Sequence, residues 1–290
     1  MKAIIFGSNG QDGQFLIDLL KYNNIDVIDS SRKNSSYDGN IEDLIFVENL
    51  IKQFVPDYIF HFAANSSTSH NALFENHDAI SSGTINILEA SRKHSPNSKI
   101  FLSGSAMQFK NEGLPIDENS TFEAKSPYAF SRIHSVYIGR YYREVFGMKI
   151  YVGYFFNHDS FLRSEKHINM KIAQFVKKVA LGFDEKLKIG NVDVMKEFNF
   201  AGDIVEAVWC LINQDMYYEV VIGSGQARSI LDWTKSCFNL IGKNWEDFVV
   251  LDNDYQPEYK ILVSNPKLLF SLGWKPKTNF EELVNKMINL

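Results

Sequence analysis

Residues Lys2–Leu16 read KAIIFGSNGQDGQFL, and this stretch carries the strongest fold signal in the chain. The apolar run Lys2–Phe6 predicts a buried strand, and helical spacing of apolar residues resumes after the loop that follows it. Gly7, Gly10 and Gly13 give that loop the spacing GxxGxxG rather than GxGxxG. Such glycines allow a tight turn, and the following helix offers its first N–H groups to a pyrophosphate. The stretch therefore predicts a dinucleotide-binding loop, with a purely structural turn as the alternative.

Strands and helices continue to alternate through the first half of the chain. The predicted strands are 26–30, 57–64, 99–105 and 149–157, and the predicted helices are 15–23, 44–54, 83–94 and 126–147. This alternation predicts an α/β fold with a doubly wound, Rossmann-type parallel sheet. The pattern loosens after Asn157. We therefore expect a dinucleotide-binding domain at 1–157 and a smaller, mainly substrate-binding lobe at 158–290, some segments of which return to the core.

The overall composition argues against several classes of function. The chain has 290 residues, 45% of them hydrophobic, and a net charge of −5. This balance is typical of a globular protein and argues against nucleic-acid binding. No apolar run approaches the ~20 residues of a membrane span, and the N-terminus does not resemble a signal peptide. Cys210 and Cys237 lack metal-ligand spacing, and the seven histidines are scattered. We expect no metal site, no membrane partner and a cytoplasmic protein with reduced thiols.

The end of the second predicted strand indicates which cofactor is bound. An acidic residue there would bind the ribose 2′-hydroxyl of NAD, whereas an arginine would favour the 2′-phosphate of NADP. The sequence is DVIDSSRK, in which Asp29 falls inside the strand and Ser31 and Arg32 fall at the expected ribose position. This order favours NADP(H) over NAD(H), with a simply solvated Arg32 as the alternative.

A candidate catalytic pair opens the longest predicted helix, where residues 126–132 read SPYAFSR. Ser126 can cap this helix, and Tyr128 and Arg132 share one of its faces because they are four residues apart. A phenol has a reference pKa near ~10, and a fixed cation beside it stabilises the phenolate. Ser105, at the end of the preceding strand, could bind the reacting oxygen. From composition alone, a half-buried helix aromatic is the more common role for a residue such as Tyr128.

Five segments together resemble an extended short-chain dehydrogenase/reductase acting on nucleotide sugars, and most of all the GDP-mannose 4,6-dehydratase and GDP-4-keto-6-deoxymannose reductase group. The segments are GSNGQDGQFL, SPYAFSR, YFFNHDSFLR, KIGNVDVMKEFNFAGDIVEA and NPKLLFSLGWKPKTNFEELV. The resemblance covers nearly the whole chain.

The resemblance implies a role for each matching residue. The implied cofactor contacts are Gly7, Asn9, Gly10, Gln11, Asp12, Gly13, Ser31, Arg32, Asn40, Ile41, Ala63, Ala64, Tyr128, Arg132 and His158. Among these, residues 7 and 10–13 would cradle the pyrophosphate, residues 31–32 the 2′-phosphate, and residues 40–41 the adenine. Asn157 would lie near the nicotinamide and the sugar, and Lys171, Lys196 and Glu258 would reach the nucleotide diphosphate.

The sequence also departs from the family pattern. Met107 stands where the dehydratases have a glutamate, and Arg132 stands where the family has lysine. In the expected nucleotide site, Lys196 and Glu197 replace arginine and aspartate, and Met170 and Tyr255 occupy positions where arginine is common. These differences leave open whether the nucleotide is GDP.

The methionine at position 107 favours some of the possible reactions over others. A 4,6-dehydratase must remove a proton from C5 and expel hydroxide from C6, which requires an acid–base group that methionine cannot supply. Reduction of a 4-keto group requires only hydride, a proton donor and oxygen stabilisation, for which NADP(H), Tyr128, Ser105 and Arg132 suffice. We therefore expect reduction of a GDP-4-keto-6-deoxy sugar, or simple dehydrogenation at C4, rather than dehydration. A dehydratase-like lyase, an epimerase and a non-catalytic nucleotide-sugar binder remain alternatives.

The resemblance also implies a homodimer or a higher homo-oligomer. Extended members often pair through two long helices, which here are 83–94 and 126–147. Arg140, Tyr141 and Tyr142 are the candidate surface residues, with a merely solvated surface as the alternative.

Overall fold

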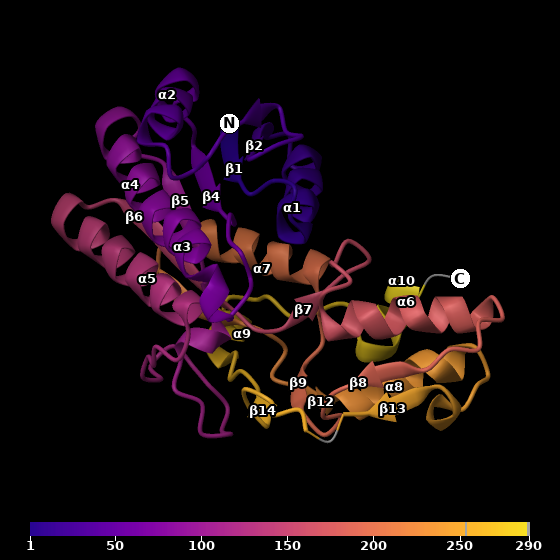
Figure 1. Cartoon of the computed structure of the whole chain (residues 1–290). Helices are drawn as coiled ribbons and strands as arrows, with labels where there is room; N and C mark the ends of the chain where they lie inside the picture. The colour runs from indigo at the N-terminus through magenta and orange to yellow at the C-terminus, as the bar shows by residue number, and fades with distance from the viewer. Residues whose placement is uncertain (253, 289–290) are drawn as a thin grey trace.

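The fold is that of a computed structural model, which describes residues 1–252 and 254–288 (Figure 1). Its centre is a seven-stranded sheet in the order β11-β6-β5-β4-β1-β2-β3, with every neighbouring pair parallel. The strands are β1 Lys2–Phe6, β2 Asp26–Ser31, β3 Tyr37–Asp38, β4 Tyr58–His61, β5 Lys99–Ser105, β6 Lys149–Phe155 and β11 Glu219–Ile222. The predicted Rossmann-type α/β fold is confirmed.

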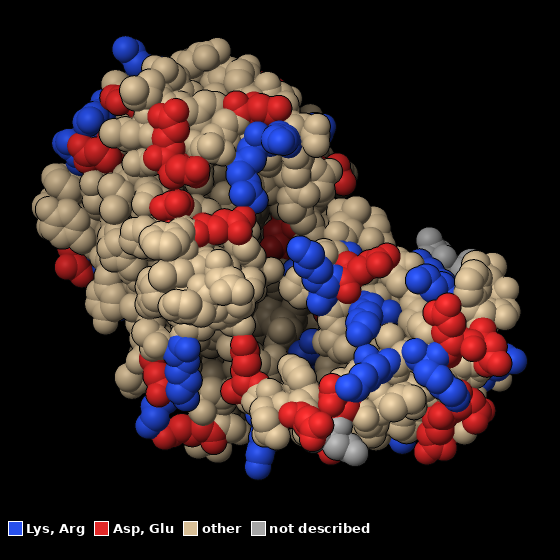
Figure 2. Space-filling view, in the orientation of Figure 1, with Lys and Arg blue, Asp and Glu red and all other residues tan. Residues whose placement is uncertain are grey.

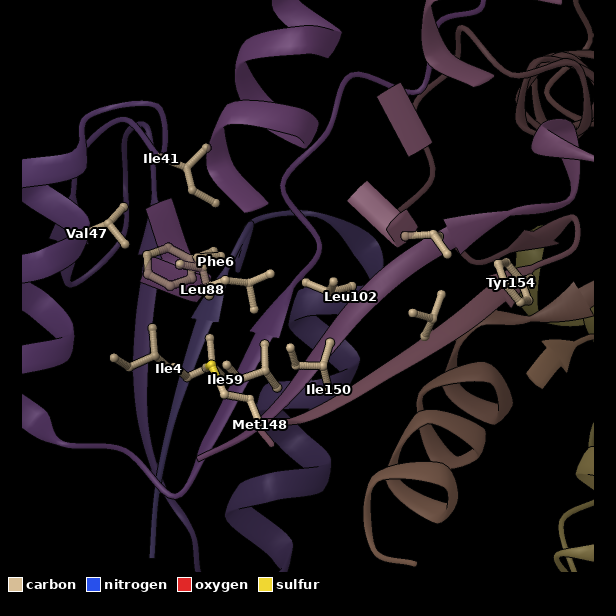
Figure 3. Close-up of a cluster of buried hydrophobic side chains, with 14 of the residues drawn as sticks. Ile4, Phe6, Ile41, Val47, Ile59, Leu88, Leu102, Met148, Ile150 and Tyr154 are labelled. Atoms are coloured by element: carbon tan, nitrogen blue, oxygen red, sulfur yellow. The ribbon is translucent and has the colours of Figure 1, made fainter. Parts of the chain in front are cut away.

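Helices cover both faces of this sheet because its strands are apolar on both sides. In β1, Ile4 and Phe6 belong to one buried cluster, and Ala3 and Ile5 belong to the other. The first cluster is completed by helices on one face and is shown in Figure 3. Those helices are α2 Leu44–Phe54, α4 Gly83–His94 and α5 Pro127–Phe146. The opposite face is covered by α1 Gln11–Tyr22 and α7 Ala201–Ile212.

Segments from the second half of the chain complete the sheet. Strand β11 pairs with β6, with Val220 opposite Gly153, and α7 packs against α1, β5 and β6. The short helix α9, Lys267–Ser271, contacts β11, and Leu269 and Trp274 join the same buried cluster. Residues beyond Asn157 therefore contribute to the buried core on the face of the sheet that α1 and α7 cover.

The remaining segments form a smaller lobe with its own apolar core (Figure 1). Its helices are α6 Ile168–Ala180, α8 Ile230–Leu240 and α10 Phe280–Ile288, with the 3-10 turn η4 Trp245–Asp247. Its short strands are β7 His158–Asp159, β8 Leu187–Ile189, β9 Met195–Glu197, β10 Asn199–Phe200, β12 Ala227–Ser229, β13 Val249–Leu251 and β14 Ile261–Leu262. Trp233, fully buried, stacks on Phe198 with ring centroids 5.2 Å apart. The substrate-binding role of this lobe stays a prediction.

Short helical turns line the edge of the sheet where the strands end. They are η1 His70–Ala72, α3 Leu73–Asn76, the π-helical η2 His77–Ser82 and η3 Ala106–Gln108. The strand predicted at 57–64 ends at His61, because the N–H groups of Phe62 and Ala63 both turn back to the Phe6 carbonyl at 2.9 and 3.0 Å. Within the described part of the chain, no helix is both long and apolar enough to cross a bilayer.

The expected pairing helices, α4 and α5, expose an apolar strip. On α5, Tyr137, Tyr141 and Val145 are each more than half exposed. Two of the candidate surface residues are engaged inside the chain instead: Arg140 pairs with Glu219 at 2.6 Å, and the Tyr142 hydroxyl donates to Glu89 at 3.0 Å. Of the three candidates, Tyr141 alone matches the expected exposed position.

Candidate active site

A cleft of about 820 Å³ opens at the carboxyl edge of the parallel sheet, where this fold binds its ligands. The predicted cofactor residues that line it are Gly7, Asn9, Gly10, Ser31, Arg32, Ile41, Ala63 and Ala64. The others, which do not belong to its lining, are Gln11, Asp12, Gly13, Asn40, Tyr128, Arg132 and His158. The adenosine and pyrophosphate end of the predicted site is thus assembled from the loops after β1, β2 and β4.

The glycine loop fits a dinucleotide in its backbone geometry. Gly7 has φ +91°, and a Cβ there would lie 2.5 Å from the Ala63 nitrogen. A Cβ on Gly13 would lie 2.6 Å from the Gly7 carbonyl oxygen, so the helix can pack closely against the loop. Gly10 lines the cleft and directly precedes α1, whose first N–H groups have no partner within the helix. These features suit a pyrophosphate at the start of α1.

The side chains of Gln11 and Asp12 point to the smaller lobe and bind the NHDS segment, residues 157–160. Gln11 donates to the His158 carbonyl at 3.3 Å and accepts from the Ser160 hydroxyl at 3.0 Å. Asp12 accepts from Nε2 of His158 at 3.0 Å. The expectation that residues 10–13 cradle the pyrophosphate stays a prediction, and for Gln11 and Asp12 it would rest on backbone groups because both side chains are engaged elsewhere. Their backbone N–H groups still lie at the start of α1, while their side chains join the glycine loop to β7.

The Asp12–His158 contact is a buried ion pair. Nδ1 of His158 donates to the Phe156 carbonyl at 2.8 Å, so Nε2 must carry a second proton in order to donate to Asp12. Burial opposes the charged imidazolium, but the Asp12 charge outweighs it and raises the pKa of His158. Burial likewise opposes the carboxylate, but His158 outweighs it and lowers the pKa of Asp12. Both shifts describe the same charged pair.

The three predicted catalytic residues lie at the end of β5 and in the first turns of α5, two elements that pack against each other. Ser126 caps α5 by accepting the Ala129 N–H at 3.1 Å, which sets Tyr128 in the first turn. Ser105 is buried and accepts the Met107 N–H at 3.2 Å, and no acceptor is found for its own proton in the described residues. Tyr128 is half-buried, with the guanidinium carbon of Arg132 lying 5.1 Å from its ring centroid.

Arg132 is anchored to β5 by a residue that the sequence analysis missed. Its guanidinium donates to the carbonyl oxygen of Ser103 and, at 2.7 Å, to the Ser103 hydroxyl. That hydroxyl in turn donates to the His61 carbonyl on β4 at 2.8 Å. Burial, and then the charge of Arg132, lower the pKa of His61 to about 3, so its ring is neutral. Ser103 lies two residues before Ser105, and this strand spacing was the available signal that both face one side.

A second cavity, of about 560 Å³, lies in the smaller lobe and is rich in lysine. Its lining includes Lys166, Lys171, Lys188, Lys196, Tyr255, Glu258 and Tyr259. Figure 2 shows a hollow between the two lobes with Lys and Arg side chains along its margin on the smaller lobe. Lys196 is 8% exposed, and burial lowers its pKa. Lys171 donates to the Lys188 carbonyl at 3.1 Å. The chemistry of this cavity suits an anionic ligand.

A third cavity, of about 590 Å³, shares lining residues with the lysine-rich cavity. Ala106, Met107 and Ser126 line it beside the predicted catalytic centre, and Glu258 and Tyr259 line both cavities. Met107 thus presents a thioether where an acid–base group would be needed. Two carboxylates also line this cavity: Glu112, which pairs with Lys110 at 2.6 Å, and Glu258, which accepts from the Thr68 hydroxyl.

Two of the departures from the family pattern lie outside the cavities. Glu197 is fully buried and accepts from Ser224, Gly225 and Ser264, so it fixes the loops around β9. Met170 is 1% exposed and packs in the core of the smaller lobe. Tyr255, in contrast, lines the lysine-rich cavity.

Asn157 occupies the junction between the lobes. Its carbonyl oxygen accepts from the side chain of Asn199 at 2.9 Å, next to the paired strands β7 and β10. Its own side-chain oxygen is buried and has no hydrogen-bond partner among the residues described. Buried acceptors without a partner are uncommon in folded proteins.

Comparison with known sequences gives one family over almost the whole chain. Residues 4–287 match the sequence model of the family described as GDP-mannose 4,6 dehydratase. GDP-mannose 4,6 dehydratase 1 of Arabidopsis thaliana is 27% identical and covers 99% of this chain and 88% of its own length. The human GDP-mannose 4,6 dehydratase is also 27% identical, with coverages of 99% and 90%.

Comparison with solved structures gives the same fold. The protein RMD from Pseudomonas aeruginosa, in complex with NADPH, superimposes with a TM-score of 0.89 at 18% identity, covering 99% of this chain and 97% of its own. UDP-glucose 4-epimerase from Thermus thermophilus, in complex with NAD, gives a TM-score of 0.87 at 18% identity, with coverages of 100% and 98%. Both likenesses extend over the sheet and the smaller lobe.

Proposed function

Since the chain belongs to the GDP-mannose 4,6 dehydratase family, we propose that it is an NADP(H)-dependent oxidoreductase acting at C4 of a nucleotide-diphosphate sugar. The favoured reaction is reduction of a GDP-4-keto-6-deoxy sugar. The observation that carries this choice is Met107, which lines the cavity beside Ser105 and can neither take nor give a proton. The residues that a carbonyl reduction needs, Ser105, Tyr128 and Arg132, are all present.

The chain's own residues would handle the proton. NADPH, when bound, supplies the hydride that adds to the C4 carbonyl carbon. Tyr128 gives its phenolic proton to the carbonyl oxygen as the alcohol forms, and the Ser105 hydroxyl donates a hydrogen bond to the same oxygen. Arg132, held against the Tyr128 ring, stabilises the phenolate that remains until solvent returns the proton. The net change is one ketone, one NADPH and one proton to one alcohol and one NADP⁺.

The cleft and the lysine-rich cavity support the assignment of the two ligands. Ser31 and Arg32 at the end of β2 favour the 2′-phosphate of NADP(H), with NAD(H) as the less favoured cofactor. Lys171, Lys196 and Glu258 would hold the nucleotide diphosphate, and the names of the relatives favour GDP as the nucleotide. Asn157 would contact the sugar. In this arrangement the sugar occupies the cavity beside Met107.

A 4,6-dehydratase is the second candidate, and a specific observation favours it. Glu112 and Glu258 both line the cavity beside Met107, so either could supply the missing acid–base group. The relatives with full-length coverage are named as dehydratases. An epimerase or a non-catalytic nucleotide-sugar binder would keep the same cleft and cavities.

A homodimer through α4 and α5 is also part of the proposal. The exposed apolar side chains Tyr137, Tyr141 and Val145 on α5 would be covered in such a pair. Analytical ultracentrifugation of the parent and of Tyr141→Glu would test this arrangement, because a buried carboxylate there should shift the protein toward the monomer.

The activity test compares two reactions. With NADPH and GDP-4-keto-6-deoxymannose, we expect loss of NADPH fluorescence and a product two hydrogens heavier by mass spectrometry. Tyr128→Phe should lower the rate by about 100-fold or more, whereas Tyr22→Phe, which alters a tyrosine 86% exposed on α1, should match the parent. With GDP-mannose and NADP⁺, formation of a 4-keto-6-deoxy product would overturn the reductase proposal in favour of the dehydratase. Tight nucleotide binding without turnover in either reaction would favour the binder.

A further inference from the structure

Three side chains from separate segments meet across the mouth of the cofactor cleft. One oxygen of Glu75, on α3, accepts from Arg32 at 3.1 Å, and its other oxygen accepts from Asn65 at 2.6 Å. Arg32 follows β2 and Asn65 follows β4, so the Glu75 carboxylate bridges the two sides of the cleft. All three residues belong to the lining of the cleft.

The Glu75 carboxylate neutralises the guanidinium that a 2′-phosphate would need. Arg32 is the cation at the predicted 2′-phosphate position, and here its guanidinium is already paired with a carboxylate. A phosphate monoester carries close to two negative charges at neutral pH. If it shared Arg32 with Glu75, like-charge repulsion from the carboxylate would oppose its binding. A ribose 2′-hydroxyl carries no charge and can instead donate a hydrogen bond to a carboxylate.

We propose that Glu75 is a specificity-determining residue that competes with the cofactor 2′-phosphate for Arg32. Its carboxylate thereby lowers the ratio of NADPH affinity to NADH affinity. The inference rests on the proposed function in one respect, namely that the cleft binds a nicotinamide dinucleotide. It adds a residue that neither the glycine loop nor the end of β2 would identify. Asn65 acts as a positioning residue, because it holds the second oxygen of Glu75 on the far side of the cleft.

The exposure of the pair sets the size of the effect. The Arg32 side chain is 70% exposed and that of Glu75 is 43% exposed, so water screens their attraction. Exposed pairs of this kind change an equilibrium by about two- to fivefold. Removing the Glu75 charge also removes its repulsion of the phosphate. We therefore expect Glu75→Gln to raise the ratio of NADPH to NADH affinity by about three- to tenfold.

The test measures dissociation constants of both reduced cofactors by fluorescence titration of the full-length protein. Glu75→Gln keeps an acceptor for Asn65 and removes only the charge. Asp78→Asn is the matched control, because Asp78 lines the same cleft and has no ion pair or side-chain hydrogen bond among the described residues. That variant removes an equal charge that is not paired with Arg32, so it should change the ratio of NADPH to NADH affinity by no more than about twofold.

A double variant isolates the competition. In the Arg32→Gln background there is no guanidinium to release, so Glu75→Gln should change the NADPH/NADH ratio by less than half as much as it does in the parent. An unchanged ratio in Glu75→Gln, or an equal rise in Asp78→Asn, would overturn the inference while leaving the proposed function intact. Failure of the parent protein to bind either cofactor would overturn the proposed function and the inference together.

Discussion

Replacing Asp12 with asparagine should weaken the connection between the glycine loop and the smaller lobe without changing the size of the side chain. Asp12 and His158 form the ion pair at 3.0 Å, with side chains 19% and 9% exposed. Removing one partner of a fully buried pair costs about 3–5 kcal/mol of unfolding free energy. Asp12 retains some contact with water, so we expect Asp12→Asn to lose about 2 kcal/mol where both partners are charged.

The sign of the pH dependence follows from the two shifts. The folded-state pKa of His158 is raised, so its contribution is fully present below its unfolded value of about 6.5 and is lost as the pH rises through the folded value. The folded-state pKa of Asp12 is lowered, so its contribution is present above about 3.9 and is lost as the pH falls through the folded value. The difference between parent and variant should therefore be largest near pH ~6 and smaller at pH ~9.

Urea unfolding at these two pH values would measure the difference. Asp18→Asn is the control, since Asp18 is exposed on the same helix and makes no side-chain hydrogen bond or ion pair within the described chain. The slope of free energy against urea should stay constant, so that the midpoint reports stability alone. An equal loss at both pH values, or no loss near pH ~6, would refute the assignment of a charged Asp12–His158 pair.

Three further perturbations test other parts of the structure. Arg132→Lys should retain hydride transfer to a keto sugar, whereas Arg132→Ala should slow it about tenfold or more in single-turnover assays; equal rates would remove Arg132 from the mechanism. Gly7→Ala should lower the free energy of unfolding by about 2–4 kcal/mol, because the new Cβ would lie 2.5 Å from the Ala63 backbone nitrogen. Gly113→Ala, at φ +81° with open space around it, should lower it by less. Similar losses in the two variants, measured by thermal unfolding, would contradict the close approach at Gly7. Glu219 has a pKa lowered to about 2, because hydrogen bonds from Arg140 and its neighbours outweigh burial. Glu219→Gln should therefore lower the free energy of unfolding by about 1–3 kcal/mol at pH ~7, and by progressively less as the pH falls from ~4 toward ~2. A loss that does not depend on pH would contradict the lowered pKa of Glu219.

Much of the fold could be predicted because its signals are local. Each central strand is a short apolar run, and each covering helix has apolar residues at helical spacing, so the alternation was readable without any long-range information. The family membership inferred from the motifs is confirmed. The place of β11 was not readable. It is four residues long, and it joins β6 through burial and the pairing of Glu219 with Arg140 on α5, both of which depend on residues far away in the sequence.

The candidate site was predictable in position but not in the direction of its side chains. Spacing identified the glycine loop and the start of α5, because backbone geometry requires particular residues there. Gln11 and Asp12 begin α1 directly after that loop, yet their side chains bind a segment almost 150 residues later. Glu75 was missed for a similar reason. It is an ordinary acid in the sequence, and it matters only because the fold brings α3 within hydrogen-bond distance of Arg32.

Arg132 shows how the surroundings can adapt a motif position to a different residue. A lysine there would offer a mobile ammonium, whereas a guanidinium needs acceptors that match its planar fork. Ser103 supplies a carbonyl and a hydroxyl oxygen on β5, and its hydroxyl is itself fixed by donation to the His61 carbonyl. The ring of His61 is neutral, so it adds no second positive charge. The cation is thereby fixed over the Tyr128 ring by two neighbouring strands, and the charge that the family places beside this tyrosine is kept although the lysine is not.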